Sequence, residues 1–494
     1  MNAGVCAVEG RTPVIVGVGQ VNHPGHDAPE PVALLAEAVE VAASDAGVPG
    51  IVGVIDSLAV MKILSWRYRD PARVVADRLG FDARRTLYTP IGGQLPMVAL
   101  HRLATDIQRG DADVAVVGGA ESWRTRAAYR ARGERLPWTT EPDNVRPSAV
   151  IGADGPTNHD AELRVGLETA PHMYPLFENA LRAARALSIA EHRGRVAQLW
   201  ARFSAVAAAN PHAWIRRRHT ADEIATVTPA NRMIAFPYTK LMNANNAVNQ
   251  AAAVLVCSAE RARALRIPED RWVFPLAGAQ AADTAFVSHR AELVASPGIR
   301  AAGKVLFELA PSAADAVAHV DLYSCFPSAV QIAATELGLD LGQPLTVTGG
   351  LTFAGGPWNN YVSHSVATMV EVLRRDPGSV GLCSATGTYL TKHALGLFST
   401  TPNPAGFRAT VVGAGPDPAR PLAEDASGMA RVETYTVVHG RSGGAERGIA
   451  ACLLDDGRRT WAASNDLAVL AAMESEEFCG RPVRLLGGGR FEPC

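Results

Sequence analysis

Residues 92–117 read GGQLPMVALHRLATDIQRGDADVAVV, and this stretch contains the basic unit of the fold. Two glycines open a segment with apolar residues at helical spacing over residues 97–108. A short polar turn follows, and then a β-branched run at residues 112–117. The order predicts a helix followed by a buried strand.

The same unit recurs along the first 120 residues. Expected strands lie at residues 14–19, 55–60 and 85–88, and expected helices lie at residues 31–43 and 71–79. Strands that alternate with helices of this length indicate an α/β protein with a mostly parallel, helix-covered sheet.

Residues 120–240 interrupt this pattern with several prolines, four tryptophans and expected helices, which predicts a helical insertion. The β/α pattern then resumes as a second layered half. There a Gly-Gly pair at residues 355–356 opens a helix that ends at Arg375, before a strand at residues 379–383. The residues alone leave open whether the two halves are a duplication or two ordinary βα units.

The last part of the chain differs in character. A proline-rich linker at residues 416–421 precedes alternating strands at residues 432–438, 448–454 and 460–463. A short helix and one further strand, at residues 483–486, complete about 65 residues by this count. We expect a small β domain here.

Composition excludes several classes of protein. The chain has 494 residues, of which 48% are apolar, and its formal net charge is -2, as expected for an ordinary globular protein. The densest basic run, residues 216–219, is too short for a phosphate-backbone stripe, so we expect no nucleic-acid partner.

The cysteines and the N-terminus bear on the compartment. The seven cysteines are scattered without a CxxC pair, which argues against a zinc site and a disulfide framework. Residues 1–10 do not have the pattern of a signal peptide, and no stretch reaches the length of a membrane span. We therefore expect a cytoplasmic protein that is not inserted in a membrane.

Four segments resemble the thiolase superfamily, especially the sterol-carrier-protein-type thiolases and the thiolase-like proteins of type 1. They follow one another in the family's order over nearly 400 residues, and they are GDADVAVVGGAES (110–122), VNQAAAVLVCS (248–258), VDLYSCFPSA (320–329) and TGGLTFAGGPWNN (348–360). The resemblance implies the thiolase fold, in which two similar halves form layered sheets and helices.

The resemblance also sets domain boundaries. It implies an N-terminal half at residues 11–258, which includes the insertion at about 120–245, and a C-terminal half at residues 259–412. Residues 425–494 resemble the additional C-terminal domain of the type 1 group, which implies an OB-like β domain.

The resemblance implies that two catalytic groups of the family are missing. Thiolases use a Cys nucleophile at a helix N-terminus and a His base. The Cys position falls on Gly93 and the His position falls on Gly356. Ordinary thiolysis is therefore not expected, and the two glycines would only line the ligand site.

Tyr323 falls where the family places an oxyanion-hole residue. Its hydroxyl could donate to an enolate oxygen, or its ring could fill the vacated pocket. Tyr361 and Cys383 are further catalytic candidates. A buried structural role is the alternative for Cys383 and, more strongly, for Cys325.

The segment KLMNANNAVN, residues 240–249, resembles the thiolase loop that contacts pantetheine. Asn243 and Asn245 lie nearest the contacting positions, although asparagines suit a turn equally well. Lys240 and Arg216 to Arg218 could meet the phosphates of CoA, or they could be solvated surface charges. CoA or acyl-CoA is the ligand that the resemblance implies, without a tightly bound cofactor or a metal.

Three functions remain open at this stage. The first is a thiolase-like protein of the acetyl-CoA acetyltransferase family, acting in acyltransfer or C–C bond chemistry of lipid metabolism. The second is a retro-aldol C–C lyase on a hydroxyacyl-CoA that uses Tyr323. The third is a non-catalytic CoA-responsive binding protein. The partner is expected to be a small-molecule thioester, and the chain could be a homodimer or a monomer.

Overall fold

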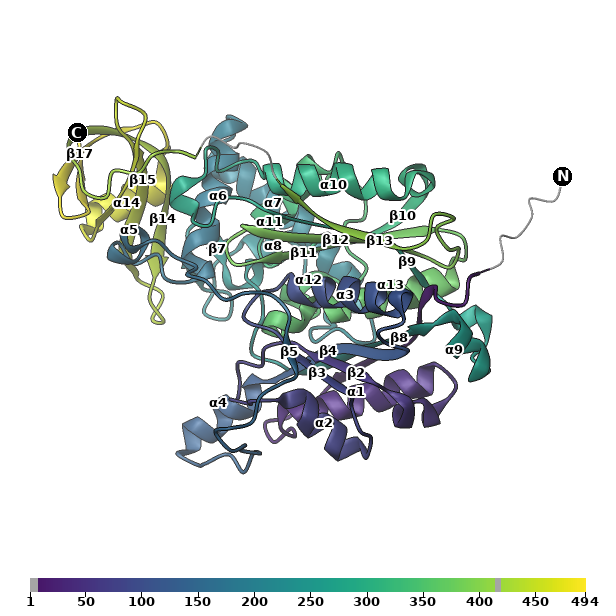
Figure 1. Cartoon of the computed structure of the whole chain (residues 1–494). Helices are drawn as coiled ribbons and strands as arrows, with labels where there is room; N and C mark the ends of the chain where they lie inside the picture. Colours follow the sequence, from purple (N-terminus) through teal and green to yellow (C-terminus); the bar gives the residue numbers. More distant parts are fainter. Residues whose placement is uncertain (1–7, 414–418) are drawn as a thin grey trace.

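The computed structural model describes residues 8–413 and 419–494, and three sheets organise these residues (Figure 1). The first sheet belongs to the N-terminal half. Its six strands, in spatial order, are β1 (Pro13–Asn22), β8 (Asn249–Ser258), β4 (Val114–Ser122), β2 (Ser57–Val60), β3 (Arg85–Tyr88) and β5 (Ala149–Val150).

The second sheet belongs to the C-terminal half and has five strands. Their spatial order is β10 (Val317–Asp321), β11 (Val380–Gly387), β12 (Lys392–Ser399), β9 (Phe274–Ala282) and β13 (Arg408–Gly413). Both sheets are mixed, whereas the sequence pattern suggested mostly parallel strands. The strand β8 runs antiparallel to both of its neighbours, and so does β12, because each returns against the βα units before it.

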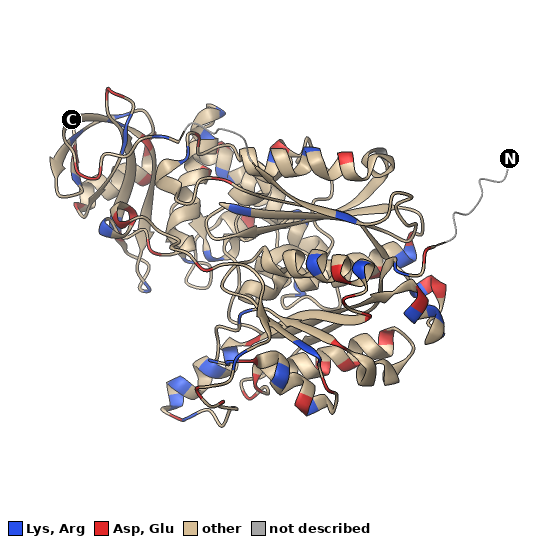
Figure 2. Ribbon diagram, in the orientation of Figure 1, with Lys and Arg blue, Asp and Glu red and all other residues tan. Residues whose placement is uncertain are grey.

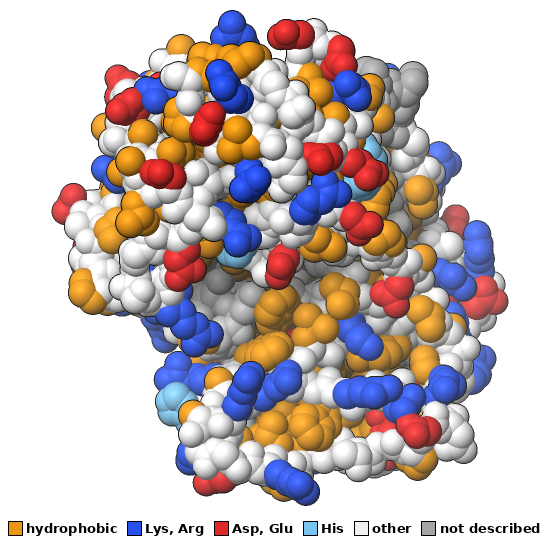
Figure 3. All heavy atoms as spheres, turned by 90° about the vertical axis from the view of Figure 1, so that its left-hand side faces the viewer, with side chains coloured by type: hydrophobic (Ala, Val, Ile, Leu, Met, Phe, Trp, Pro, Cys, Tyr) orange, Lys and Arg blue, Asp and Glu red, His pale blue; other side chains and the backbone are white. Residues whose placement is uncertain are grey.

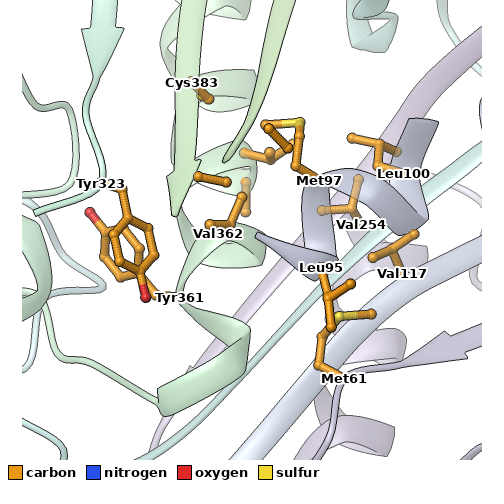
Figure 4. Close-up of a cluster of buried hydrophobic side chains, with 14 of the residues drawn as sticks. Met61, Leu95, Met97, Leu100, Val117, Val254, Tyr323, Tyr361, Val362 and Cys383 are labelled. Carbon is orange, nitrogen blue, oxygen red and sulfur yellow. The ribbon is translucent and has the colours of Figure 1, made fainter. Parts of the chain in front are cut away.

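Helices separate and cover these two sheets. The helices α3 (Leu95–Arg109) and α13 (Tyr361–Arg375) lie between the two sheets. Each of them contacts β8 of the first sheet and both β11 and β12 of the second. The outer layers are formed by α1 (Pro31–Asp45) with α2 (Pro71–Leu79), and by α10 (Pro297–Leu309) with α11 (Pro327–Glu336). Figure 4 shows the apolar core around α3, where Met97 and Leu100 face Val117 and Val254. The result is the layered thiolase architecture that the resemblance implied.

The outer edge of the first sheet is covered by the chain itself. The short strand β5 pairs with Leu87 and Tyr88 of β3, and Ser148 exchanges hydrogen bonds with Thr86 through both side chains. The amide of Ile151 then donates to the carbonyl of Tyr88 at 3.0 Å. The β3 edge therefore has little backbone left for another strand to pair with.

The third sheet joins the insertion to the C-terminal residues. Its order is β15 (Ala445–Leu453), β16 (Arg459–Ser464), β18 (Arg490–Pro493), β17 (Pro482–Gly487), β14 (Ser427–His439), β6 (Met233–Ala235) and β7 (Tyr238–Thr239). The insertion contributes the helices α4 (Trp123–Arg132), α5 (Asp160–Arg164), α6 (Ala170–Ala184), α7 (Ile189–Ala209) and α8 (Ala221–Ala225). Three further helices are α9 (Ala259–Ala264), directly after β8, α12 (Gly350–Phe353), before α13, and α14 (Leu467–Ser475), among the C-terminal strands.

The C-terminal strands pack directly on the insertion. The amide of Phe236 donates to the carbonyl of Val437 at 2.9 Å, and the Phe236 ring stacks on Tyr435 with centroids 6.0 Å apart. The side chain of Asn179 on α6 donates to the carbonyl of Tyr435 at 2.8 Å. The expected β domain at residues 425–494 therefore shares one apolar core with residues of the insertion.

Charged residues lie mainly at the periphery of the ribbon, where both signs are interspersed (Figure 2). The helix α4 is the exception, since Arg126, Arg130 and Arg132 follow one another along it. Within the parts of the chain that the structure describes, no helix combines the length and hydropathy that a membrane crossing requires.

Candidate functional site

The loop after β10 places Tyr323 against the first turn of α3. A Cβ atom added to Gly93 would lie 2.4 Å from the Tyr323 hydroxyl oxygen and 2.5 Å from the carbonyl oxygen of Thr386. Ordinary carbon–oxygen contacts are longer than 3 Å, so no side chain fits at residue 93 while Tyr323 keeps this position. The tyrosine hydroxyl thus occupies the space into which a nucleophile at residue 93 would project.

The Tyr323 side chain is buried, and its backbone amide donates to the Ser384 hydroxyl at 2.8 Å, which fixes the loop on β11. No hydrogen bond from its hydroxyl is found among the residues that the structure describes. Burial raises the pKa of the Tyr323 phenol above its ordinary value, and the neighbouring Cys325 adds to the rise. The hydroxyl is therefore protonated at neutral pH and can donate.

Tyr361 lies at the start of α13 with its ring edge-on to Tyr323, at 5.6 Å between centroids (Figure 4). Its hydroxyl lies 2.6 Å from the Thr348 hydroxyl and donates to the carboxylate of Asp321 at 3.1 Å. That carboxylate also accepts from Thr346 and from the amides of Val347 and Thr348. Tyr361 thus belongs to a satisfied buried network that supports the loop before α12.

Cys383 lies in the middle of β11, fully buried and apart from the two tyrosines (Figure 4). Burial raises the pKa of its thiol, and the nearby Asp321 carboxylate acts in the same direction. Burial likewise raises the pKa of the Cys325 thiol to about 12. Neither sulfur has the electropositive, accessible surroundings of a reactive cysteine.

Gly356 lies in a different environment from Gly93. A Cβ atom at Gly356 would lie 2.9 Å from the Asn246 Oδ1 atom and 3.5 Å from the Ala244 Cβ atom. The Gly356 amide donates to the carbonyl of Asn245 at 2.9 Å. The helix α13 is thus held through its preceding loop to residues 244–246.

Those residues line a cavity of about 670 Å³. Its walls come from the start of α4, the loop after α7, β6 and the segment that follows β7, and much of its lining is apolar. Among the residues that line it are Trp214, Ile215, Leu241, Ala244 and Thr352. Figure 3 shows the face that carries the C-terminal sheet and, below it, α4, with hydrophobic side chains in a recess between the upper and lower parts and Lys and Arg nearby.

Asn243 and Asn245 both line this cavity. Asn243 is 9% exposed, and its amide nitrogen donates to the carbonyl of Thr239 at 2.8 Å. Its Oδ1 atom is buried and has no hydrogen-bond partner within the described parts of the chain. An unpaired buried oxygen in a cavity wall is a position for a ligand donor, because leaving it unsatisfied costs free energy.

Two cations also line the cavity, Lys240 and Arg124. The Arg124 guanidinium lies 5.9 Å from the centre of the Trp214 ring and 3.3 Å from the ring of His26. Arg217 forms an ion pair with Glu223 instead and does not line the cavity. The positive charge expected from residues 216–218 is thus supplied at the cavity by other side chains.

The cavity does not reach the tyrosines, because neither Tyr323 nor Gly93 is part of its lining. Arg124, Trp214 and Asn246 also line the cavity, although none of them was predicted from the sequence. Arg124 directly follows the segment that ends at Ser122, so extending that motif by two residues would have found it. The other two depend on how the insertion folds back onto the core.

No metal centre is evident in the described parts of the chain, where no three His, Cys, Asp or Glu side chains gather in a suitable arrangement.

Comparison with solved structures identifies the family. The chain is similar to a structure described as a monomeric SCP2-thiolase like protein type 1 from Mycobacterium smegmatis, with 32% sequence identity and a TM-score of 0.84. The match covers 99% of this chain and 100% of that one. This chain belongs to the SCP2-thiolase-like proteins of type 1. The family profile called "Thiolase-like protein type 1 additional C-terminal domain" also matches this thiolase-like protein, at residues 414–489.

Two further structures share the fold of this thiolase-like protein at lower identity. One is described as the Ltp2-ChsH2(DUF35) aldolase, with 20% identity, a TM-score of 0.60 and coverage of 79% of this chain and 98% of that one. The other is the dimeric peroxisomal thiolase of Saccharomyces cerevisiae, with 15% identity, a TM-score of 0.58 and the same two coverages. No curated protein sequence matched the chain.

Proposed function

We propose that this thiolase-like protein binds a CoA thioester in the cavity beside α4 and does not perform thiolysis. The observation that carries the proposal is the cavity itself, which combines apolar walls with Lys240, Arg124 and the unpaired Oδ1 atom of Asn243. A pantetheine thioester has matching parts, since its arm carries amide donors and its nucleotide end carries phosphates.

The absence of thiolysis is supported by the surroundings of Gly93. Thiolysis by the usual route needs a thiolate at that position and a base opposite it. Gly93 and Gly356 supply neither, and Tyr323 fills the space in front of α3. Buried Cys383 does not substitute, because its raised pKa keeps the thiol protonated.

Calorimetric titration of the protein with CoA and acetyl-CoA tests the binding. We expect saturable binding that Lys240→Ala weakens about threefold to tenfold, as for the loss of one charge-assisted contact. Lys304→Ala, on the exposed face of α10, is the matched control and should leave the affinity unchanged. Wild-type protein that releases no heat and gains no thermal stability with millimolar ligand would contradict the proposal.

A retro-aldol lyase is the second candidate, and the free hydroxyl of Tyr323 favours it. Cleavage of a hydroxyacyl thioester needs a donor to the enolate oxygen but no covalent nucleophile. A phenol kept protonated by burial can supply that donor. In this reading, Tyr323 must become accessible from the cavity when substrate binds.

Product analysis distinguishes the two candidates. A lyase should release an aldehyde or ketone from a hydroxyacyl-CoA, and Tyr323→Phe should abolish the release by removing one oxygen while keeping the ring. Tyr129→Phe on α4 serves as the control with the same chemical change. Equal release by Tyr323→Phe and wild-type protein would refute the lyase, and binding without any product would leave the first proposal standing.

A further inference from the structure

A second cavity, of about 380 Å³, lies where the insertion meets the C-terminal sheet. Three arginines from separate elements line it: Arg164 ends α5, Arg447 lies on β15, and Arg490 begins β18. It shares no lining residue with the cavity proposed for the thioester. Three arginines that are far apart in the sequence thus line the same cavity.

The positive charge of this cavity is not neutralised by carboxylates within ion-pair distance. Among the described residues, none of the three guanidinium groups forms an ion pair. Arg164 donates to the backbone carbonyl of Glu424, and Arg447 donates weakly to the carbonyl of Val165 at 3.5 Å. Like charges brought together without a counter-charge repel one another, so an anion would relieve that repulsion.

Acidic residues also lie around this cavity. The Asp425 carboxylate accepts at 2.9 Å from the amide of Gly488, which is one of the lining residues, and the loop backbone thereby holds it. Glu446 and Glu168 line the adjoining cavity of about 250 Å³, which shares Arg447 with this one. Among the residues that the structure describes, no Asp or Glu lines the cavity of about 380 Å³ itself, whereas three arginines do.

Glycines shape the site at two points. A Cβ atom at Gly166 would lie 2.7 Å from an Nη atom of Arg447, and one at Gly489 would lie 3.3 Å from Val165. Gly489 also has a φ of 69°, in the left-handed region that favours glycine. These positions allow α5 and the β17–β18 turn to approach closely enough to bring the arginines together.

We infer that this cavity is a binding site for a small molecule that carries a phosphate or diphosphate group. Arginine is well suited to such groups because its planar fork matches their oxygens. A nucleic-acid strand fits less well, since strand binding uses exposed aromatic rings for stacking. The aromatic side chains here, Phe491 in the lining and Trp461 beside it, are both buried.

Titration with inorganic pyrophosphate at low ionic strength tests the site in the full-length protein. Wild-type protein should bind with salt-sensitive affinity, and Arg447→Gln and Arg490→Gln should each weaken binding at least tenfold. Arg484→Gln is the matched control, because Arg484 lies on β17 outside the cavity and pairs with Glu492. Melting temperatures of the variants show that each is folded.

Three outcomes would overturn the inference. The first is no binding of millimolar pyrophosphate by wild-type protein. The second is unchanged binding by both cavity variants, especially if Lys240→Ala abolishes it, because the anion would then occupy the thioester cavity. The third is a single-stranded oligonucleotide that binds more tightly than pyrophosphate and loses affinity in the same two variants.

Discussion

The two central helices, α3 and α13, follow glycine-containing stretches, but the space in front of each is used differently. Before α3, the side chain of Tyr323 and the carbonyl of Thr386 fill the space beside Gly93. Before α13, Gly356 faces the end of the Asn246 side chain, which borders the large cavity. One helix end is plugged by core residues, and the other adjoins a ligand-sized space.

This difference shows that two glycines in front of central helices can be packed in different ways within one fold. A glycine leaves space that a protein interior does not tolerate empty. At Gly93 a fixed tyrosine ring fills that space, whereas at Gly356 a polar side chain that borders a cavity fills it. A cavity can therefore lie beside one helix end while the other end is closed.

The largest expected effect comes from adding one carbon at each glycine. Gly93→Ala should lower the free energy of unfolding by about 2 to 3 kcal/mol, because the new Cβ atom meets a fixed ring and a backbone carbonyl. Gly356→Ala should cost less than about 1 kcal/mol, because the Asn246 side chain can move away. Chemical denaturation of both variants measures the difference.

Gly53→Ala is the control, since a Cβ atom there meets nothing within 4 Å. If Gly93→Ala were as stable as Gly356→Ala, Tyr323 would be mobile rather than a plug. The lyase proposal would then gain support.

A second effect should depend on pH and involves one buried histidine on each of the two helices. His101 on α3 and His364 on α13 are buried, and burial lowers the pKa of each to about 3. The unfolded chain binds a proton at each histidine below about pH 6.5 while the folded chain does not. Stability should therefore be full above pH 6.5 and fall toward pH 3, by about 1.4 kcal/mol per pH unit for each histidine.

His101→Phe should remove the contribution of His101 to the pH dependence of the free energy of unfolding between pH 6 and pH 4. Denaturation at several pH values measures this change. Neither ring nitrogen of His101 has a hydrogen-bond partner among the residues that the structure describes, so His101→Phe removes no hydrogen bond at neutral pH. His364→Phe should remove the same slope but cost more stability, because its Nδ1 atom lies 2.9 Å from the Gln20 Oε1 atom. An unchanged slope in His101→Phe would mean that this histidine is protonated in the folded protein.

Much of the fold could be predicted from the sequence because its βα units are local patterns. The helix expected at residues 97–108 is α3, and the strand expected at residues 112–117 is β4, shifted by two residues at its start. The antiparallel direction of β8 and β12 could not be read in this way. Strand direction depends on which strands meet in space, and β8 follows an insertion of more than a hundred residues by sequence count.

Residues of the candidate site could be predicted from the sequence only where they belong to a recognisable motif. The alignment of Gly93, Tyr323 and Gly356 with a reaction centre came from the family resemblance, and it stays a prediction. The sequence left open whether Tyr323 fills its pocket or serves chemistry, because that depends on how closely its hydroxyl approaches Gly93, which lies 230 positions away in the chain. The choice between homodimer and monomer was also open, and the covered edge of β3 is a feature that only the folded chain reveals.

The shared core of the insertion and the C-terminal sheet has a consequence for the order in which the protein is made. Ala235 on β6 leaves the ribosome roughly 200 residues before Val438, its partner on β14. At 5 to 20 residues per second, that interval is about 10 to 40 s. During it, the apolar surface around Met233 and Phe236 has no sheet to cover it. Completion of the chain, rather than docking of a finished module, is what closes the molecule.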